Sequence, residues 1–189
     1  MPTRKILWFW WLLLFSLLAA VFFLTSKIGG LPKVVQVSDP GLYAIDHFID
    51  GDTIAVNMNG TVETVRMIGV DTPETHRPNS PVQCYGPEAA AYTKQLIGGN
   101  RVRLQADPLD TNRDRYNRLL RYIYLPDGRM VETELISNGY GFAYTQFPFE
   151  KTDEFTADQD SAKQQAKGLW TACQVHMEDN GRQQTNDAQ

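Results

Sequence analysis

The sequence is poor in the residues that build zinc sites. It contains three histidines and two cysteines in 189 residues. These residues show none of the short Cys/His spacings by which zinc sites are recognised. We therefore expect no zinc centre, and we assign the histidines surface or structural roles. The residues concerned are His47, His76, His176, Cys84 and Cys173.

Positive charge is also scarce for a protein that would coat nucleic acid. The formal net charge is −4, from 18 basic and 22 acidic residues. The four bases before residue 34 have no acid among them, which leaves 14 bases against 22 acids in the rest. Non-specific binding to a phosphate backbone needs a basic surface. Any nucleic-acid contact must therefore come from a local basic site, and residues 101–121 offer one, with six arginines against three aspartates.

Polar residues are almost missing from the N-terminal segment. Ile6–Leu24 is a run of 19 residues in which Ser16 is the only clearly polar member. A helix of this length covers most of the roughly 30 Å hydrocarbon core of a bilayer. We predict a short tail at residues 1–5 and a transmembrane signal anchor at residues 6–26. The alternative is a cleaved secretory signal, whose apolar region is usually about 7–15 residues long and ends at a small-x-small cleavage site.

The charges around this segment suggest where the following domain lies. Arg4 and Lys5 precede the run and favour a cytoplasmic N-terminus. The domain would then be anchored on the extracytoplasmic side of the membrane, or secreted if the segment is cleaved. Two cysteines in such a compartment can form a disulfide. We expect Cys84 and Cys173 to pair, and two unpaired core thiols are the alternative.

The rest of the chain divides into a linker, one domain and a tail. Residues 27–41 contain Gly, Pro and Ser and form the linker, residues 42–175 form the domain, and the polar residues 176–189 are predicted to be disordered. Within the domain, β-branched and apolar residues predict five strands, and helical patterning predicts three helices. The strands are 42–49, 53–58, 61–68, 101–106 and 119–125, and the helices are 88–97, 131–138 and 152–167.

Turn and capping signals support these elements. Asn59-Gly60 joins the second and third strands and is a strong hairpin signal, because both positions of such a turn need φ > 0. Pro87 suits the first turn of a helix, and Gly139 and Gly168 suit helix ends. Strands that come early and helices that come late predict an α+β fold. We expect a small five-stranded barrel with three helices, preceded by the transmembrane helix.

Three short segments combine acidic and basic residues at the ends of predicted strands. They are residues 49–53 (Ile-Asp-Gly-Asp-Thr), 65–74 (Val-Arg-Met-Ile-Gly-Val-Asp-Thr-Pro-Glu) and 114–118 (Asp-Arg-Tyr-Asn-Arg). Carboxylates at strand ends are accessible to solvent and can hold a hard cation through oxygen ligands. Attack of water on a phosphodiester accumulates negative charge, so catalysis needs cations around the phosphate and a base for the water. The arginines, aspartates and glutamate of these segments supply such groups.

Each segment also has an ordinary structural interpretation. Residues 50–52 can form a turn, and residues 71–74 can form a turn or a helix cap. The charges of residues 114–118 can be solvated surface ion pairs, each worth under about 1 kcal/mol. Only their combination points to catalysis.

In this order the three segments resemble the staphylococcal nuclease family. The shared motifs are Asp-Gly-Asp-Thr, Arg-x3-Val-Asp-Thr-Pro-Glu and Asp-x-Tyr-x-Arg, and the resemblance runs from about Ile45 to Trp170. It implies a five-stranded OB-type barrel with three helices. It also implies a calcium-dependent endonuclease that cleaves DNA, with RNA as an open second substrate, and leaves 3′-phosphate products. We expect a monomer, with the membrane and the nucleic acid as its contacts and no protein partner.

The resemblance assigns a metal site and a base. Asp52 and Asp71 match the family's calcium-ligating aspartates, and the backbone carbonyl of Thr72 is expected to join them. Asp50 matches a nearby acid that supports the site. Glu74 matches the residue that activates or orients the attacking water.

The resemblance also assigns the groups that bind the substrate. Arg66 and Arg118 match the two arginines that grip the phosphate, for which the planar, permanently charged guanidinium is suited. Arg115 and Tyr116 match a basic and aromatic pair beside the nucleotide. Tyr144 matches, across a one-residue gap, an aromatic residue on which a base packs.

Two features depart from the family pattern. The domain is acidic where the archetype is strongly basic, and the archetype's lysine-bearing loop after the glutamate has no clear counterpart in residues 75–86. Weaker substrate capture or a need for more calcium would follow. One alternative function is a catalytically inactive, membrane-tethered nucleic-acid-binding module, which should have lost the acidic and arginine positions. Another is a tethered scaffold for an envelope complex.

Overall fold

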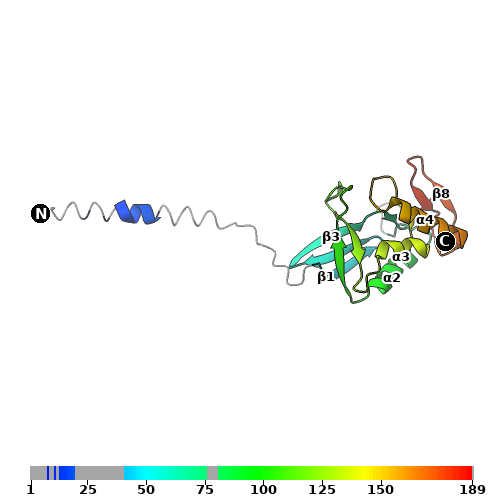
Figure 1. The fold of residues 1–189 in the computed structure, drawn as a ribbon, viewed down its shortest axis with the longest axis horizontal. Coiled ribbons are helices and arrows are strands. Elements are labelled where there is room, and N and C mark those ends of the chain that lie inside the picture. Colours follow the sequence, from blue (N-terminus) through cyan, green and yellow to red (C-terminus); the bar gives the residue numbers. More distant parts are fainter. Residues whose placement is uncertain (1–7, 9–10, 12, 20–40, 76–80, 189) are drawn as a thin grey trace. The chain divides into compact units, whose positions relative to one another are not determined.

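The computed structural model describes residues 8, 11, 13–19, 41–75 and 81–188. The chain divides into two compact units, Met1–Gln36 and Val37–Gln189, which are taken separately below (Figure 1). In the first unit, residues 8, 11 and 13–19 are helical and exposed. Most of the predicted transmembrane segment (6–26) and of the linker (27–41) lies outside the described residues. Within the described part of the chain, no helix has both the length and the apolar character needed to cross a bilayer.

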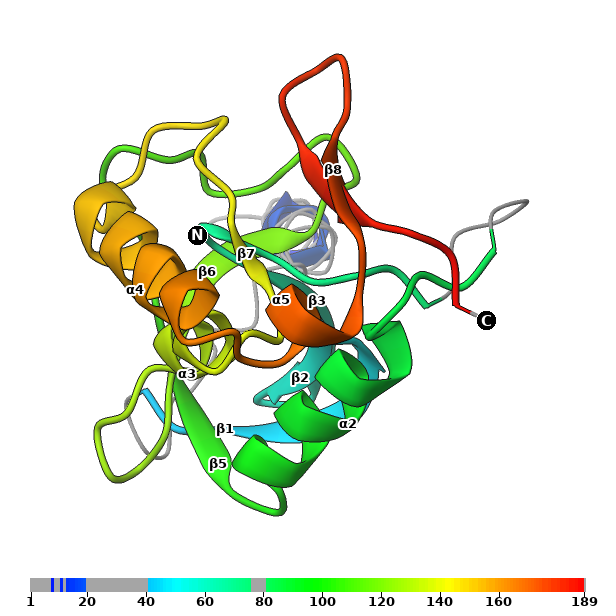
Figure 2. The ribbon, with the colours of Figure 1, turned by 90° about the vertical axis from the view of Figure 1, so that its right-hand side faces the viewer.

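Five strands of the second unit form a closed barrel (Figures 1 and 2). The order around the barrel is β1-β2-β3-β6-β5. Neighbouring strands are antiparallel except β3 and β6, which run parallel. The strands are β1 (Tyr43–Asp50), β2 (Thr53–Met58), β3 (Thr61–Met67), β5 (Arg101–Gln105) and β6 (Leu119–Tyr124).

The hairpin of β2 and β3 forms as its turn residues predict. Asn59 and Gly60 have φ angles of 56° and 93°. The register that follows from this turn pairs Thr53, the first residue of β2, with Arg66 near the end of β3. The charged segments 49–53 and 65–74 therefore lie side by side.

The parallel pairing of β3 and β6 brings in the third charged segment. Val65 of β3 pairs with Leu119 of β6, and residues 114–118 form the turn that leads into β6, closed by the Asp114 amide, which donates to the Arg118 carbonyl at 3.1 Å. An ion pair of 3.0 Å between Arg113 and Glu63 links the base of this turn to β3. Each charged segment thus lies at the end of β3 or joins a strand that pairs with it.

Four helices accompany the barrel: α2 (Gly86–Ile97), α3 (Val131–Ser137), α4 (Thr152–Gln164) and α5 (Leu169–Ala172). Ile97, Leu135 and Phe155, from α2, α3 and α4, are fully buried and share one core with the strand residues Ile54 and Val65. Full burial of a side chain of this kind contributes about 1.5–3 kcal/mol. The helices therefore hold the barrel in the shape that positions its charged corner.

The predicted α+β fold with a five-stranded barrel is confirmed, and each predicted strand and helix lies within a few residues of its expected bounds. The described part of the chain also contains elements that were not predicted. β4 (Val70–Asp71) pairs with β7 (Phe142–Ala143), and α5 is a single short turn. These elements are too short to carry a period of apolar residues, so no sequence pattern could indicate them.

The predicted disorder of residues 176–189 is wrong for the residues that the structure describes. β8 (Val175–Met177) and β9 (Gln183–Thr185) form an antiparallel hairpin, drawn in red in Figure 2. The chain then runs along residues 82–84, where the Cys84 amide donates to the Asn186 carbonyl at 2.7 Å and the Ala188 amide donates to the Val82 carbonyl at 2.8 Å. Backbone pairing, which a polar composition does not reveal, is what orders this segment.

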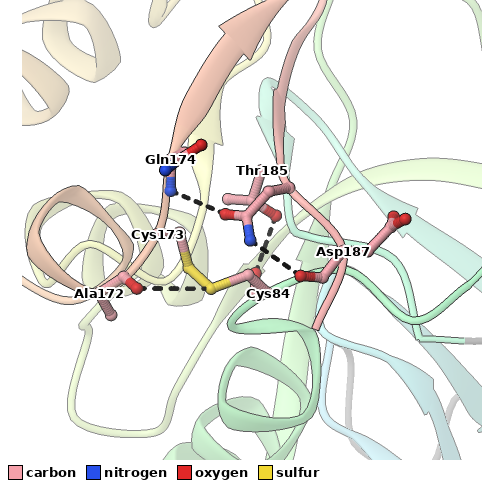
Figure 3. The surroundings of a disulfide bond; sticks show 7 residues. Cys84, Ala172, Cys173, Gln174, Thr185 and Asp187 are labelled. Carbon is pink, nitrogen blue, oxygen red and sulfur yellow. Dashed lines mark hydrogen bonds between the residues drawn. A yellow bond between two sulfur atoms is a disulfide. The ribbon is translucent and has the colours of Figure 1, made fainter. Parts of the chain in front are cut away.

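Cys84 and Cys173 form the predicted disulfide, with a Cα–Cα distance of 5.9 Å (Figure 3). It ties the turn before α2 to the residue after α5. Thr185 Oγ1 donates to the Cys84 carbonyl at 2.8 Å, and the Gln174 amide donates to Asn186 Oδ1 at 2.7 Å. In the chain-entropy model a loop of this size contributes about 4–5 kcal/mol to stability. The C-terminal hairpin is therefore anchored at its base.

One buried carboxyl in the helical layer has no charged partner at hydrogen-bond distance among the described residues. Glu132, on α3, is fully buried. Its two carboxyl oxygens accept the Ile123 amide at 3.0 and 3.2 Å. Burial raises the pKa of Glu132 well above its ordinary value of 4.5. Keeping this group in the core therefore costs more free energy at neutral pH than in acid.

We expect Glu132→Gln to raise Tm at pH 8 by about 2–8 °C, or about 1–2 kcal/mol for a chain of this size. An acid whose pKa is raised by folding gives its full contribution below the unfolded-state pKa, and that contribution is lost as the pH rises toward the folded-state pKa. Glutamine keeps an oxygen for the Ile123 amide and cannot ionise. Thermal unfolding at pH 4 and pH 8 checks this, and an equal effect of the substitution at both pH values would rule out ionisation as its cause.

Candidate active site

The turn between β1 and β2 presents two acidic side chains. Asp50 ends β1 and pairs with Thr53, so Gly51 and Asp52 form the turn. The Thr53 hydroxyl donates to Asp52 Oδ1 at 2.9 Å. On the other side, the Thr93 hydroxyl of α2 donates to the Gly51 carbonyl at 2.6 Å. The turn is thus fixed against a helix.

Asp52 reaches across to the second charged segment. It is 7% exposed, and its Oδ2 accepts the Thr72 amide at 2.9 Å. This approach depends on Gly51, because a Cβ atom there would lie 2.6 Å from Thr72 Oγ1. The glycine of the Asp-Gly-Asp motif therefore allows the two segments to pack in contact.

Arg66 lies between the two predicted metal ligands. One terminal nitrogen is 3.1 Å from Asp52 Oδ2 and 3.0 Å from Asp71 Oδ1. The other terminal nitrogen donates to the carbonyls of Met67 at 2.9 Å and Val70 at 2.7 Å. The guanidinium therefore holds the turn from which Asp71 emerges and brings the two carboxylates face to face.

Asp71 carries a second guanidinium that the sequence did not predict. Arg182 Nε lies 2.6 Å from Asp71 Oδ2, and a terminal nitrogen of Arg182 lies 2.9 Å from Oδ1. Burial raises the pKa of Asp71, which is 4% exposed, and the charges of Arg66 and Arg182 oppose that shift. Burial alone would lower the pKa of Arg182, but its hydrogen bonds and charge interaction with Asp71 raise it. The two groups form a partly buried, bidentate ion pair.

Asp50 and Glu74 form a second acidic pair beside the first. Burial, a hydrogen bond with Glu74 and the charge of Asp52 raise the pKa of Asp50 to about 7. The Thr75 hydroxyl donates to Asp50 Oδ1 at 2.9 Å. Glu74 is positioned through its backbone, because its amide donates to Gln83 Oε1 at 2.7 Å and its carbonyl accepts the Gln83 amide at 2.9 Å. Its half-buried side chain is hydrogen-bonded to Asp50.

The third charged segment stands on the neighbouring strand. Arg118 contacts Asp114 through two nitrogens, at 2.7 and 2.6 Å from Oδ2. The Tyr116 ring is 64% exposed, and the guanidinium carbons of Arg115 and Arg118 lie 4.8 and 5.4 Å from its centroid. These contacts are cation–π interactions. Tyr116 therefore presents an exposed ring with two guanidiniums beside it in the turn that leads into β6.

Tyr144 follows β7, next to the strand that carries Asp71. Its amide donates to the Gly69 carbonyl at 2.8 Å. Its hydroxyl donates to Gln146 Oε1 at 3.2 Å, and its ring centroid is 6.0 Å from that of Phe147, which is 60% exposed. The Tyr144 side chain is close enough to Arg182 to affect its pKa. The predicted aromatic residue is therefore near the acidic corner.

The predicted site residues thus fall into two groups. The carboxylates, Thr72 and Arg66 form a single contact cluster. Arg118 lies apart from them, with Arg115 and Tyr116 in the turn before β6. The cluster comprises Asp50, Asp52, Arg66, Asp71, Thr72 and Glu74, and the second group comprises Arg115, Tyr116 and Arg118.

The donor set of the cluster fits a calcium ion. Calcium takes carboxylate, carbonyl and water oxygens, and Asp52 and Asp71 offer two converging carboxylates. Thr72 follows Asp71 in the chain and donates its amide to Asp52, and its Oγ1 is buried with no hydrogen-bond partner among the described residues. The Arg182 guanidinium binds both carboxylate oxygens of Asp71, where a metal cation would bind. Across the described residues no group of three or more His, Cys, Asp or Glu forms a metal cage, so backbone oxygens and water would complete the shell.

Sequence reasoning missed four residues of this site: Thr75, Gln83, Thr93 and Arg182. Gln83 and Thr93 use their side chains to bond the backbone of Glu74 and Gly51, and neither residue belongs to a recognisable motif. Arg182 had two faint signals, because it is the only Lys or Arg after Lys167 and it follows Asn180-Gly181, a dipeptide typical of hairpin turns. These signals could have indicated the hairpin, but not what its arginine contacts.

Comparison with known proteins supports the same assignment. Residues 64–172 match the family model described as "Staphylococcal nuclease homologue". The chain is 43% identical over 149 residues to Endonuclease YncB of Bacillus subtilis (strain 168), a match that covers 78% of this chain and 70% of YncB. It is 40% identical over 130 residues to the Thermonuclease of Staphylococcus hyicus, covering 68% of this chain and 75% of that protein.

A third relative is longer than this chain. The SPbeta prophage-derived endonuclease YokF of Bacillus subtilis (strain 168) is 42% identical over 129 residues, which make up 67% of this chain but 43% of YokF. The chain therefore spans less than half the length of that relative. Because the family model matches more than half of its residues, the chain belongs to the staphylococcal nuclease family.

Proposed function

We propose that this protein is a calcium-dependent endonuclease that hydrolyses DNA, with RNA as a second substrate, and leaves 3′-phosphate ends. The observation that carries the proposal is the cluster at the barrel corner. Two buried aspartates share one arginine, and the hydrogen-bonded pair of Asp50 and Glu74 lies beside one of them, Asp52. The relatives named endonuclease and thermonuclease share this family, which supports the same chemistry.

Asp52 and Asp71 would hold the calcium ion, with the backbone carbonyl of Thr72. When bound, calcium supplies positive charge next to the phosphate on which negative charge builds up. The remaining contributions come from side chains. Arg66 and Arg118 bind the phosphate oxygens and stabilise the charge of the transition state, and Arg118 can assist the departing 5′ oxygen.

Glu74 acts as the base. Its side chain is half-buried, and its backbone is held by Gln83, because the Glu74 amide donates to Gln83 Oε1 and the Glu74 carbonyl accepts the Gln83 amide. From there it takes or orients a proton of the water that attacks phosphorus in line. The neighbouring Asp50 and Thr75 form the polar rim beside it. The position of Glu74 is thus set by the backbone.

The basic segment captures the substrate. Residues 101–121 supply local positive charge on an otherwise acidic domain. Tyr116, with Arg115 and Arg118 against it, offers a stacking face for one base, and Tyr144 with Phe147 offers another near Asp71. Because the charge is local, we expect binding to weaken steeply with salt.

We also propose that the domain acts outside the cytoplasm, anchored by residues 6–26. The apolar run and the basic residues before it support the anchor. The disulfide supports an oxidising compartment. The inactive binding module is the weaker alternative, because Asp52, Arg66, Asp71, Glu74 and Arg118 are all present.

Cleavage of single- and double-stranded DNA by the full chain, titrated with calcium, tests the proposal. We expect calcium-dependent cleavage that excess chelator abolishes, and 3′ ends that a polymerase extends only after phosphatase treatment. Asp71→Asn should remove cleavage, whereas Asp127→Asn, a matched change at an exposed ion pair, should not. Undiminished cleavage in chelator would exclude calcium, and no cleavage at any calcium concentration would favour the binding module.

A further inference from the structure

The C-terminal hairpin delivers a positive charge to the predicted calcium site. Arg182 lies 111 residues after Asp71 in the chain, and its guanidinium donates to both Asp71 carboxylate oxygens, at 2.6 and 2.9 Å. The side chains of Arg182 and Asp71 are 18% and 6% exposed. A pair that is this well shielded from solvent is screened less than a surface pair. The contact is therefore a built part of the site.

The charges of the two predicted calcium ligands are balanced without a metal. Asp52 and Asp71 supply two carboxylates, and Arg66 and Arg182 supply two guanidiniums. Arg66 also holds the turn carbonyls of residues 67 and 70, so its position is needed for the fold. Among the described residues, the Arg182 side chain makes no hydrogen bond with those carbonyls. It is the cation that can leave when a divalent ion arrives.

The hairpin presents Arg182 from a fixed base and an ordered turn. At the base, the disulfide and the Thr185 hydrogen bond tie the hairpin to Cys84. In the turn, the Arg182 amide donates to Asn180 Oδ1 at 2.7 Å. The Asn180 carbonyl in turn accepts Gln146 Nε2 at 2.7 Å, which fastens the turn to the segment after Tyr144. Arg182 is therefore held at a high effective concentration beside Asp71.

We propose that Arg182 is an intramolecular competitor of the divalent cation, and that it sets the cation affinity of the site. A calcium ion that uses the Asp71 oxygens must first displace the Arg182 fork from them. The inference rests on the proposed calcium site and adds a residue that controls it. When calcium displaces the guanidinium from Asp71, the guanidinium and the hairpin turn that carries it move away together. The disulfide keeps the base of the hairpin in place.

Competition of this kind lowers the apparent affinity for calcium, and the coupling between the two ligands is reciprocal. Removing the guanidinium should therefore strengthen calcium binding. We expect Arg182→Gln to lower the Kd for calcium by about tenfold, within the usual range of coupling between linked sites. Arg182→Lys keeps the charge but cannot make the two-pronged contact, so its Kd should lie between the two.

Calorimetric titration of the full chain with calcium alone tests this without any nucleic acid. Arg129→Gln is the matched control, since Arg129 also forks onto an aspartate, Asp127, at an exposed turn. We expect tighter binding in Arg182→Gln and no change in Arg129→Gln. Equal or weaker binding in Arg182→Gln would overturn the competitor role while leaving the calcium site intact. Binding by none of the proteins would overturn both the site and the role.

A second measurement on the wild-type protein does not depend on any variant folding. The Nε of Arg182 lies 2.6 Å from Asp71 Oδ2. Its hydrogen-bonded proton should give a slowly exchanging NMR signal in the absence of calcium. Calcium should move this signal to the position of a solvated arginine, with a midpoint at the calorimetric Kd. A signal that stays unchanged when calcium saturates the protein would show that the ion binds without displacing Arg182, and would refute the proposal.

Discussion

Glu74→Gln is expected to lower kcat for DNA hydrolysis by about 10²–10⁴-fold, the usual contribution of a general base. Glutamine has nearly the same shape but cannot accept the proton of the attacking water. The contacts that position residue 74 use its backbone amide and carbonyl, so they survive the change. The glutamine amide can also still donate to Asp50. The loss should therefore appear in turnover, with calcium affinity and Tm nearly unchanged.

Single-turnover cleavage at saturating calcium measures this effect directly. Glu88→Gln is the matched control, because Glu88 is an exposed glutamate on α2. It should cleave at the wild-type rate. If Glu74→Gln also turned over at the wild-type rate, Glu74 would have no place in the mechanism, and Asp50 would become the next candidate base at this corner.

Arg118→Lys is expected to lower kcat/KM on the order of 10²–10³-fold. Lysine keeps the positive charge, so simple attraction of the substrate survives. It loses the planar fork that can bind two phosphate oxygens at once. The backbone of residue 118 stays in place, because its amide donates to Asp114 Oδ1 at 2.9 Å. The effect should therefore come from the transition state and leave the fold alone.

Arg129→Lys serves as the control for Arg118→Lys. Arg129 is an exposed arginine outside residues 101–121 that, like Arg118, contacts one aspartate through two nitrogens, here Asp127. Its replacement should change kcat/KM little at fixed salt. A wild-type rate in Arg118→Lys would reduce this residue to an electrostatic role. Arg66 would then be the only arginine of the site that binds two phosphate oxygens at once.

Arg66 is a less informative target for substitution. Its two terminal nitrogens contact Asp52, Asp71 and the carbonyls of residues 67 and 70. Replacing it would release the turn that presents Asp71 and leave buried carboxylates with less positive charge. A loss of activity in such a variant would combine damage to the fold with loss of phosphate binding. Arg118, which contacts Asp114, separates the two effects.

The barrel could be predicted because its signals are local. The strands alternate or run apolar over several residues, and Asn59-Gly60 dictates its own turn. Once that hairpin forms, the pairing of Thr53 with Arg66 follows from counting residues. The sequence alone therefore allows the prediction that residues 49–53 and 65–74 lie side by side. The two-residue strands β4 and β7 were not, because so short a segment has no period.

Contacts between distant parts of the chain mark the limit of that reasoning. The bond between Arg182 and Asp71 depends on where the C-terminal hairpin lies, and the hairpin depends on backbone pairing with residues 82–84. Its polar residues give no apolar stripe to follow. The cysteine pair was the one feature that tied this region to the domain, and the disulfide it forms anchors the hairpin's base.

A crystal structure of the Glu74→Gln variant with calcium and a short single-stranded oligonucleotide tests the central claim most directly. We predict one calcium ion about 2.3–2.6 Å from oxygens of Asp52 and Asp71, with Arg182 displaced. One phosphate should lie beside that ion, within hydrogen-bond reach of Arg66 and Arg118. A calcium ion bound elsewhere, or a phosphate beyond the reach of both arginines, would contradict the assignment of this corner as the active site.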